Sequence, residues 1–151
     1  MEAFLLSVHV VAGILFVGPV AVAASLFPRY APVHAAVGDV QPVERSHDTA
    51  RALHRITRGY GYLALIVPVI GLALAGVQGR TTEIWVLVAM LLTAAAGALL
   101  VLQITPRQRD ALESPDDGTQ LRRIGMVTGI FNVLWAVVVV LMIVRPGSTY
   151  V

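Results

Sequence analysis

The sequence lacks cysteine and lysine altogether, and only 13% of its 151 residues are charged. The absence of cysteine excludes disulfide bonds, thiolate metal sites and cysteine nucleophiles. The eleven basic residues are all arginines, and 57% of the chain is hydrophobic, which is not typical of a soluble protein. The mean hydropathy of +0.78 indicates a membrane protein with several spans.

Charged side chains are also missing from four long apolar segments. These segments run from about 3 to 28, 60 to 77, 84 to 105 and 124 to 144. A helix needs about 20 apolar residues to cross a bilayer, and its backbone polar groups must be satisfied internally. The sequence therefore predicts an all-α polytopic membrane protein, a four-helix transmembrane bundle that forms a single domain over residues 1–151.

The arginines are distributed unevenly between the loops. Nine of the eleven lie in the first loop, residues 29–59, or the third loop, residues 106–123, whereas Arg80 and Arg145 lie on the other side. Cytoplasmic loops are enriched in arginine and lysine. We therefore expect loops one and three to be cytoplasmic, both termini to be outside, and the membrane to be a bacterial cytoplasmic (inner) membrane.

The first loop changes character near Ser46. Residues 31–43 are rich in proline, alanine and glycine, and we expect them to be irregular. Ser46 is a suitable N-cap and Asp48 would lie in the first turn of a following helix, where an anion is favoured. The pattern predicts a helix that starts near His47 and enters the membrane near Tyr60.

The arginines of this helical extension form a basic face next to the membrane. Arg51, Arg55 and Arg58 follow one another at helical spacing. Arginines close to an anionic leaflet gain roughly 1 kcal/mol each. We predict that these three side chains contact lipid headgroups.

Prolines are expected to distort three of the four helices. Pro19 and Pro68 fall within the first and second spans, where each removes one backbone hydrogen bond and favours a kink. Pro106 follows the third apolar segment, and we expect it to end that helix. The following SPDDG segment, residues 114–118, is typical of a turn.

His9 differs from the other histidines because it lies inside an apolar segment. An ionisable side chain within a span is rare and is a functional-site hypothesis by default. We expect it roughly 10 Å inside the outer membrane boundary, from the 1.5 Å rise per helical residue. Met90 and Met142 should lie at a similar depth, and a His/Met haem site is chemically reasonable. A hydrogen bond from His9 to a backbone group or to a hydroxyl, such as that of Ser7 or Thr93, is the interpretation that we favour.

The remaining polar residues favour structural interpretations. His54 should lie near the opposite membrane face from His9, so the two are not expected to bind one metal or haem iron. His34, His47 and His54 are expected to face solvent or lipid. Asn132 should find a partner across a helix interface, with Gln103 and Thr128 as candidates.

Two segments resemble a known group of membrane proteins. They are SVHVVAGILFVGPVAVAAS, which contains His9 with Gly13 and Gly18, and GYLALIVPVIGLALAG. They are similar to an uncharacterised bacterial family of integral membrane proteins, distantly similar to the four-helix copper-resistance D-type proteins and J-type protoporphyrinogen oxidases. The resemblance implies a first-span histidine associated with haem b. The oxidases also use a lysine in a later span, which is absent here, so it does not imply oxidase activity.

The sequence contains no nucleotide-binding loop, zinc-binding helix, nucleophile elbow or pair of intramembrane carboxylates. We therefore expect a non-enzymatic accessory or scaffold subunit, with the lipid bilayer and either its own copies or other membrane subunits as partners, and no nucleic acid. The alternative is a haem b- or metal-binding redox protein that uses His9, with Met90 or Met142. A small-molecule or copper permease is the third hypothesis, because the spans lack acidic and methionine-rich pathways.

Overall fold

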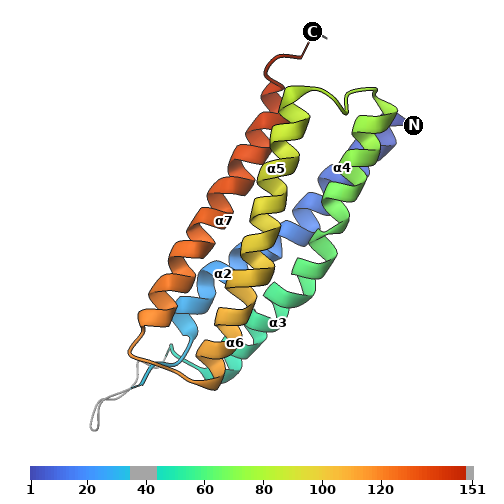
Figure 1. Cartoon of the computed structure of the whole chain (residues 1–151). Coiled ribbons are helices and arrows are strands. Elements are labelled where there is room, and N and C mark those ends of the chain that lie inside the picture. Colours follow the sequence, from blue (N-terminus) through green and yellow to red (C-terminus); the bar gives the residue numbers. More distant parts are fainter. Residues whose placement is uncertain (35–43, 149–151) are drawn as a thin grey trace.

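The protein is described by a computed structural model that covers residues 1–34 and 44–148. Every regular element in these residues is a helix, which confirms the all-α prediction (Figure 1). The elements are α1 (Glu2–Ala12), the π-helix η1 (Gly13–Val17), α2 (Gly18–Tyr30), α3 (His47–Ala64), α4 (Ile66–Val77), α5 (Ile84–Leu99), the π-helix η2 (Leu100–Ile104), α6 (Thr105–Glu113) and α7 (Thr119–Val144). The expectation of an irregular segment falls mostly on residues 35–43, which lie outside the described residues.

The elements join into four long helical spans. They are Glu2–Tyr30, His47–Val77, Ile84–Glu113 and Thr119–Val144, and each is long and apolar enough to cross a membrane. Figure 1 shows them side by side, with both chain termini at one end of the bundle. We call this the terminal end, and we call the opposite end, which carries the first and third loops, the arginine end.

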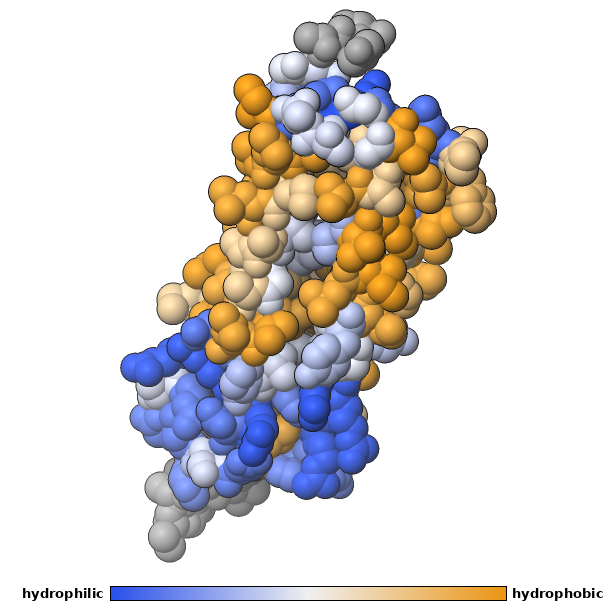
Figure 2. All heavy atoms as spheres, turned by 45° about the vertical axis from the view of Figure 1, so that its right-hand side comes forward, coloured by the Kyte–Doolittle hydropathy of each residue, from blue (hydrophilic) through white to orange (hydrophobic). Residues whose placement is uncertain are grey.

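A belt of apolar side chains surrounds the spans. Figure 2 shows this belt in orange, next to a strongly hydrophilic arginine end. The most exposed members include Ile14, Val69, Leu91, Leu102 and Ile143, each of which is at least 67% exposed. An apolar surface of this extent is unfavourable in water, so the belt is suited to contact with lipid tails.

The second span begins as the sequence predicts. Helix α3 starts at His47, and the backbone N–H of Thr49 donates to the Ser46 hydroxyl at 3.5 Å. Asp48 lies in the first turn. The N-cap and the first-turn carboxylate together define the start of the helix.

Both π-helices precede a proline. Pro19 follows η1 and Pro106 follows η2, and a proline ring clashes with the carbonyl four residues earlier in a regular helix. A π-turn widens the backbone at that point and relieves the clash. The expectation that Pro106 ends the third helix is wrong, because η2 lets the helix continue as α6 to Glu113.

The second span is interrupted at Leu65, three residues before Pro68. The N–H of Leu65 donates to the carbonyl of Tyr62 at 3.2 Å, a tighter pattern than that of an α-helix. The fourth span has no proline and is a single α-helix, α7. Each of the three proline-containing spans is therefore interrupted near its middle.

Packing is dense toward the arginine end. Helix α2 lies between α3 and α7 there, with extensive contacts to both. Two buried clusters fill this half, one around Val20, Ala24, Ala96, Leu100, Ile104, Val127 and Phe131, the other around Phe27, Ala31, Ala50, Ala111, Leu121 and Ile124. The many alanines allow the helix backbones to approach closely.

Packing is sparse toward the terminal end. In this half α1 pairs with α4 and α5 pairs with α7, but α4 and α5 share few contacts although they are neighbours in the chain. The buried cluster here consists of Ala75, Trp85 and Val86, with Met142 packed against it. The two helix pairs therefore leave space between them.

Candidate functional site: a cavity with a buried histidine

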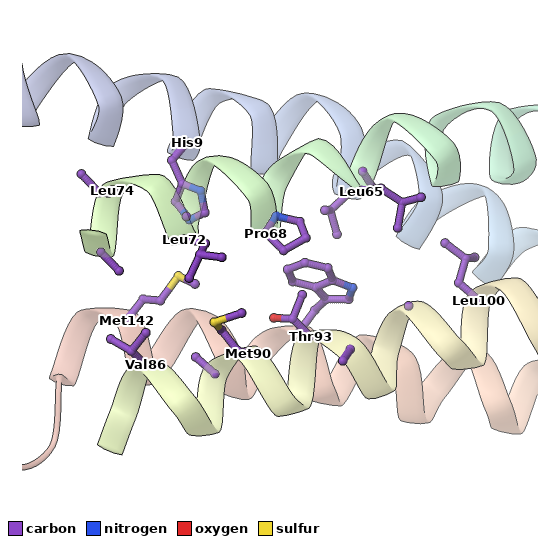
Figure 3. Close-up of a pocket in the computed structure, with 18 of the residues that line it drawn as sticks. His9, Leu65, Pro68, Leu72, Leu74, Val86, Met90, Thr93, Leu100 and Met142 are labelled. Atoms are coloured by element: carbon purple, nitrogen blue, oxygen red, sulfur yellow. The ribbon is translucent and has the colours of Figure 1, made fainter. Parts of the chain in front are cut away.

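A cavity of about 520 Å³ occupies the space between the two helix pairs. Its walls come from all four spans, and its length runs from Arg145 at the terminal end to Leu100 in η2. Figure 3 shows α1 and α4 on one side of this space and α5 and α7 on the other. Its volume is within the range of about 300–1,000 Å³ that is usual for small-molecule and cofactor sites.

The cavity reaches the apolar surface between α4 and α5. Leu65 and Leu72 on one edge, and Met90 and Leu102 on the other, line the cavity and are also exposed. Figure 2 shows paler residues inside the orange belt on this face. A molecule dissolved in a surrounding bilayer would therefore reach the cavity sideways, between these helices.

His9 projects from α1 toward α4 and lines this cavity (Figure 3). It is 8% exposed, and its ring lies against Gly71 of α4. A Cβ atom at position 71 would stand 2.8 Å from Cε1 of the ring, which is too close for any side chain. Gly71 therefore makes room for the imidazole where α1 and α4 pack together.

Of the partners expected for His9, the structure has a backbone group and neither of the two hydroxyls. The ring contacts the backbone of Val67, one turn before Gly71, but Nδ1 is buried without a hydrogen-bond partner among the described residues. The expected bond to Ser7 is wrong, because its hydroxyl donates to the carbonyl of Ala3 at 2.8 Å. Thr93 lines the same cavity but makes no hydrogen bond with His9.

The structure brings the three candidate ligands from the sequence to one cavity. His9 comes from α1, Met90 from α5 and Met142 lies near the end of α7. Figure 3 shows both methionine side chains on the side of the cavity opposite His9, with their sulfur atoms in the intervening space. This convergence of an imidazole and two thioethers is the main chemical feature of the site.

Trp135 contributes a second unsatisfied polar group. Its indole lines the cavity and packs edge-to-face on Phe131, with ring centroids 6.3 Å apart. Its Nε1 is buried without a hydrogen-bond partner among the described residues. A buried N–H of this kind costs about 1–3 kcal/mol when it stays unpaired, so a ligand acceptor next to it would be stabilising.

A polar cluster that the sequence did not reveal closes the terminal end of the cavity. The Arg145 guanidinium lies 5.7 Å from the centroid of the Trp85 ring, and its Nε donates to the Met142 carbonyl at 3.2 Å. The Trp85 indole N–H donates to the Glu83 carboxylate, which also pairs with Arg80 at 3.7 Å. A single charge at a span end is common, and only the fold shows that these four side chains meet.

Asn132 lies outside the cavity, and its expected partners are wrong. Its amide Nδ2 donates to the Ser25 hydroxyl of α2 at 3.0 Å, rather than to Gln103 or Thr128. The carbonyl Oδ1 has no partner among the described residues. Asn132 therefore joins the first and fourth spans and is not part of the site.

The predicted lipid-contacting arginines separate into two environments. Arg51 lines a second, smaller pocket with His47 and His54, whereas Arg55 and Arg58 are exposed outside that pocket. His47 is exposed, which agrees with the expected contact with solvent or lipid, and His54 is half-buried beside it. In the described part of the chain, no three His, Cys, Asp or Glu side chains gather into a metal-binding group.

Comparisons with family models, with curated proteins and with solved structures found no match for this chain. The resemblance to the copper-resistance D-type and J-type oxidase proteins therefore stays a hypothesis.

Proposed function

We propose that this chain is a membrane protein that binds an apolar small molecule of the bilayer in the cavity, with His9 as its polar anchor. Haem b is the ligand that the donor set fits best. The observation that carries the proposal is the convergence of His9, Met90 and Met142 on one cavity of about 520 Å³. The proposal puts ligand binding ahead of the accessory-subunit hypothesis.

The cavity itself favours ligand binding over a purely structural role. Protein interiors are close-packed, and an empty space costs stability roughly in proportion to its volume. The walls of this space also include His9 and Trp135, whose Nδ1 and Nε1 atoms are buried without a hydrogen-bond partner among the described residues. A scaffold subunit gains nothing from the empty space, whereas a bound ligand would fill it.

Three features of this chain fit a haem. His9 has an unpartnered ring nitrogen, Gly71 holds the ring in a cradle that any Cβ would fill, and two thioether sulfurs face the same cavity. His9 and one of the two methionines would hold the haem iron, and Arg145 at the end of the cavity would pair with propionate groups. When bound, a haem of this type supplies one-electron transfer.

The permease hypothesis is less well supported. The cavity ends near Leu100, where the densely packed cluster around Ala24, Ala96 and Phe131 begins. A permease needs a route to both sides of the membrane, and this cluster separates the cavity from the arginine end. A cavity that reaches the surface between α4 and α5 and ends at this cluster is better suited to holding a ligand than to transporting one.

The proposed setting follows from the arginine distribution. We infer that the arginine end faces the cytoplasm of a bacterial cell, with both termini and the cavity toward the outer face of the inner membrane. Labelling of single cysteines at Ser114 and Ser148 from the two sides of intact membrane vesicles tests this orientation. Labelling of both positions from the same side would contradict it.

An absorbance spectrum tests the haem proposal. The protein is purified in detergent, titrated with haem, and measured oxidised and after reduction with dithionite. We expect a Soret band that is lost or strongly shifted in His9→Ala, and a change in the reduced spectrum in either Met90→Ala or Met142→Ala. His34→Ala, which removes an exposed histidine at the arginine end, is the matched control.

Two outcomes would contradict the proposal. If the wild-type protein carries no haem absorbance after unbound haem has been removed, haem b is not the ligand. A His9→Ala variant with the wild-type spectrum would remove His9 as its anchor.

A further inference from the structure

A second pocket lies at the arginine end, between α3 and α6. Its volume is about 400 Å³. The residues that line it are His47, Arg51, His54, Arg109, Leu112 and Glu113. It belongs to the hydrophilic part of the surface in Figure 2, away from the cavity that contains His9. The proposed function makes no use of this pocket.

Helical spacing brings the basic side chains together. His47, Arg51 and His54 follow one another at intervals of four and three residues, so they share one face of α3. Helix α6 packs against α3 here and contributes Arg109 from the other side. Two helices thus supply four cationic or protonatable side chains to one concave surface.

Hydrogen bonds orient both imidazoles. His54 Nδ1 lies 3.2 Å from Oε1 of the fully buried Gln108, and His47 Nε2 lies 3.4 Å from the carbonyl of Leu112. Both of these oxygens accept only, so each ring donates through the stated nitrogen and keeps its second nitrogen for a ligand. Gln108 Nε2, next to His54, is also buried without a partner among the described residues.

The positive charge of the pocket is only partly neutralised. Arg109 pairs with Glu113 at 2.9 Å, and this pairing raises the pKa of Arg109 above its ordinary value, so its guanidinium stays charged. No described carboxylate lies within ion-pair distance of Arg51. Arg51 therefore has an uncompensated guanidinium between two imidazoles on the α3 side of the pocket.

We propose that this pocket binds a phosphate monoester, either as the headgroup of an anionic lipid such as phosphatidic acid or as a free phosphate compound. A guanidinium binds phosphate oxygens through two parallel hydrogen bonds. The second nitrogens of His47 and His54 are left for further contacts with the phosphate group. The pocket is concave and small, which suits one phosphate group better than an extended acidic surface.

Titration of the protein in nanodiscs tests this proposal. One arm adds inorganic phosphate to nanodiscs of phosphatidylcholine at constant ionic strength, and a second arm adds phosphatidic acid to the disc lipids. Binding is followed by the ³¹P signal of the phosphate monoester and by the rise in unfolding temperature that a ligand of the folded state produces. Binding of inorganic phosphate supports a free phosphate ligand, and binding of phosphatidic acid alone supports a lipid headgroup.

Two charge-matched variants separate the pocket from general attraction to anions. Arg51→Gln removes a pocket guanidinium, and Arg55→Gln removes an exposed one four residues along the same helix. We expect Arg51→Gln to weaken binding about tenfold or more, and Arg55→Gln to leave it within about twofold, since only Arg51 would lose a charge-assisted hydrogen bond to the phosphate.

Arg109→Gln, on the opposite helix, should resemble Arg51→Gln, and circular dichroism checks that each variant is folded. Equal effects of Arg51→Gln and Arg55→Gln would overturn the proposal, because they would indicate that the anion is attracted to the positive surface as a whole rather than bound in the pocket. Absence of binding in both arms would overturn it as well.

Discussion

The two halves of the bundle are built in opposite ways. Toward the arginine end, alanines and large apolar residues close the interior, as around Phe27, which is 0% exposed. Toward the terminal end, the same four spans leave a cavity of about 520 Å³ with an imidazole on its wall. The comparison indicates that one half holds the helices together while the other half is available for binding.

The boundary between the closely packed half and the half with the cavity lies at the helix interruptions. Val17 of η1, Leu65 between α3 and α4, and Leu100 of η2 all line the cavity. Pro19, Pro68 and Pro106 lie at or close to these interruptions, and α4 and α5 share few contacts. The cavity therefore begins where three of the four spans depart from a regular α-helix.

Side-chain truncation should show the largest difference between the two halves. Phe27→Ala, in the closed half, should lower the free energy of unfolding by about 3–5 kcal/mol, because it leaves a hole in a packed cluster. Leu72→Ala, on the exposed edge of the cavity, should cost about 1 kcal/mol or less. Unfolding in mixed micelles with increasing denaturing detergent measures both values, and equal losses would contradict the comparison.

Two glycines of α4 test the fit around His9. Gly71→Ala should weaken haem binding at least tenfold, because the added Cβ would lie 2.8 Å from the His9 ring and must displace it. Gly76→Ala is the control, since no atom lies within 4 Å of a Cβ at that position. Haem titration of the two variants gives the affinities. A Gly71→Ala protein with the affinity of the control would contradict the claim that Gly71 makes room for the His9 ring.

The bond between Ser25 and Asn132 should make a smaller contribution to the closed half. The two side chains join α2 to α7 at 3.0 Å. A double-mutant cycle with Ser25→Ala and Asn132→Ala should give a coupling energy of about 0.6 kcal/mol, with about 1.7 as the upper bound for such bonds in membranes. A coupling energy of zero would show that the bond does not support the interface.

The smallest expected effect is a pH dependence at the start of α7. Hydrogen bonds from Thr119 lower the pKa of Asp117 below its ordinary value, and Oδ1 accepts from the Thr119 N–H at 3.1 Å. Since the folded state favours the ionised carboxylate, the stabilisation is complete above the ordinary pKa and is lost as the pH falls through the lower folded value. Thermal unfolding between neutral and acidic pH should show a shallower decline for Asp117→Asn than for wild type. If the unfolding temperatures of Asp117→Asn and wild type decline in parallel with falling pH, Asp117 makes no such contribution to stability.

The sequence was sufficient for the four helical spans and for placing three of the cavity residues at one depth. Uncharged segments of membrane length predict the four spans, and axial depth alone groups His9 with Met90 and Met142. Depth does not determine which way a side chain points, and for this reason the hydroxyl partners named for His9 and the partners named for Asn132 are wrong. The backbone partner that was the other option for His9 agrees with the structure. The continuation beyond Pro106 depends on a π-turn, which a rule based on regular helix geometry does not anticipate.

The pocket at the arginine end could not be predicted from the sequence either. The spacing of His47, Arg51 and His54 places them on one face of a helix, but it does not reveal that Arg109 lies opposite. Long-range packing of α3 against α6 decides this. Contacts between distant segments, rather than local patterns, determine both sites.

Native mass spectrometry of the protein released from membranes tests most directly whether the terminal half is a binding chamber. Gly97→Phe should fill the cavity from its wall, and Gly129→Phe, which lies outside the cavity, is the matched control, because a Cβ at either position meets no atom within 4 Å. We expect a bound small molecule in wild type and in Gly129→Phe that is absent from Gly97→Phe. The same bound mass in all three proteins, or none in any, would contradict the account.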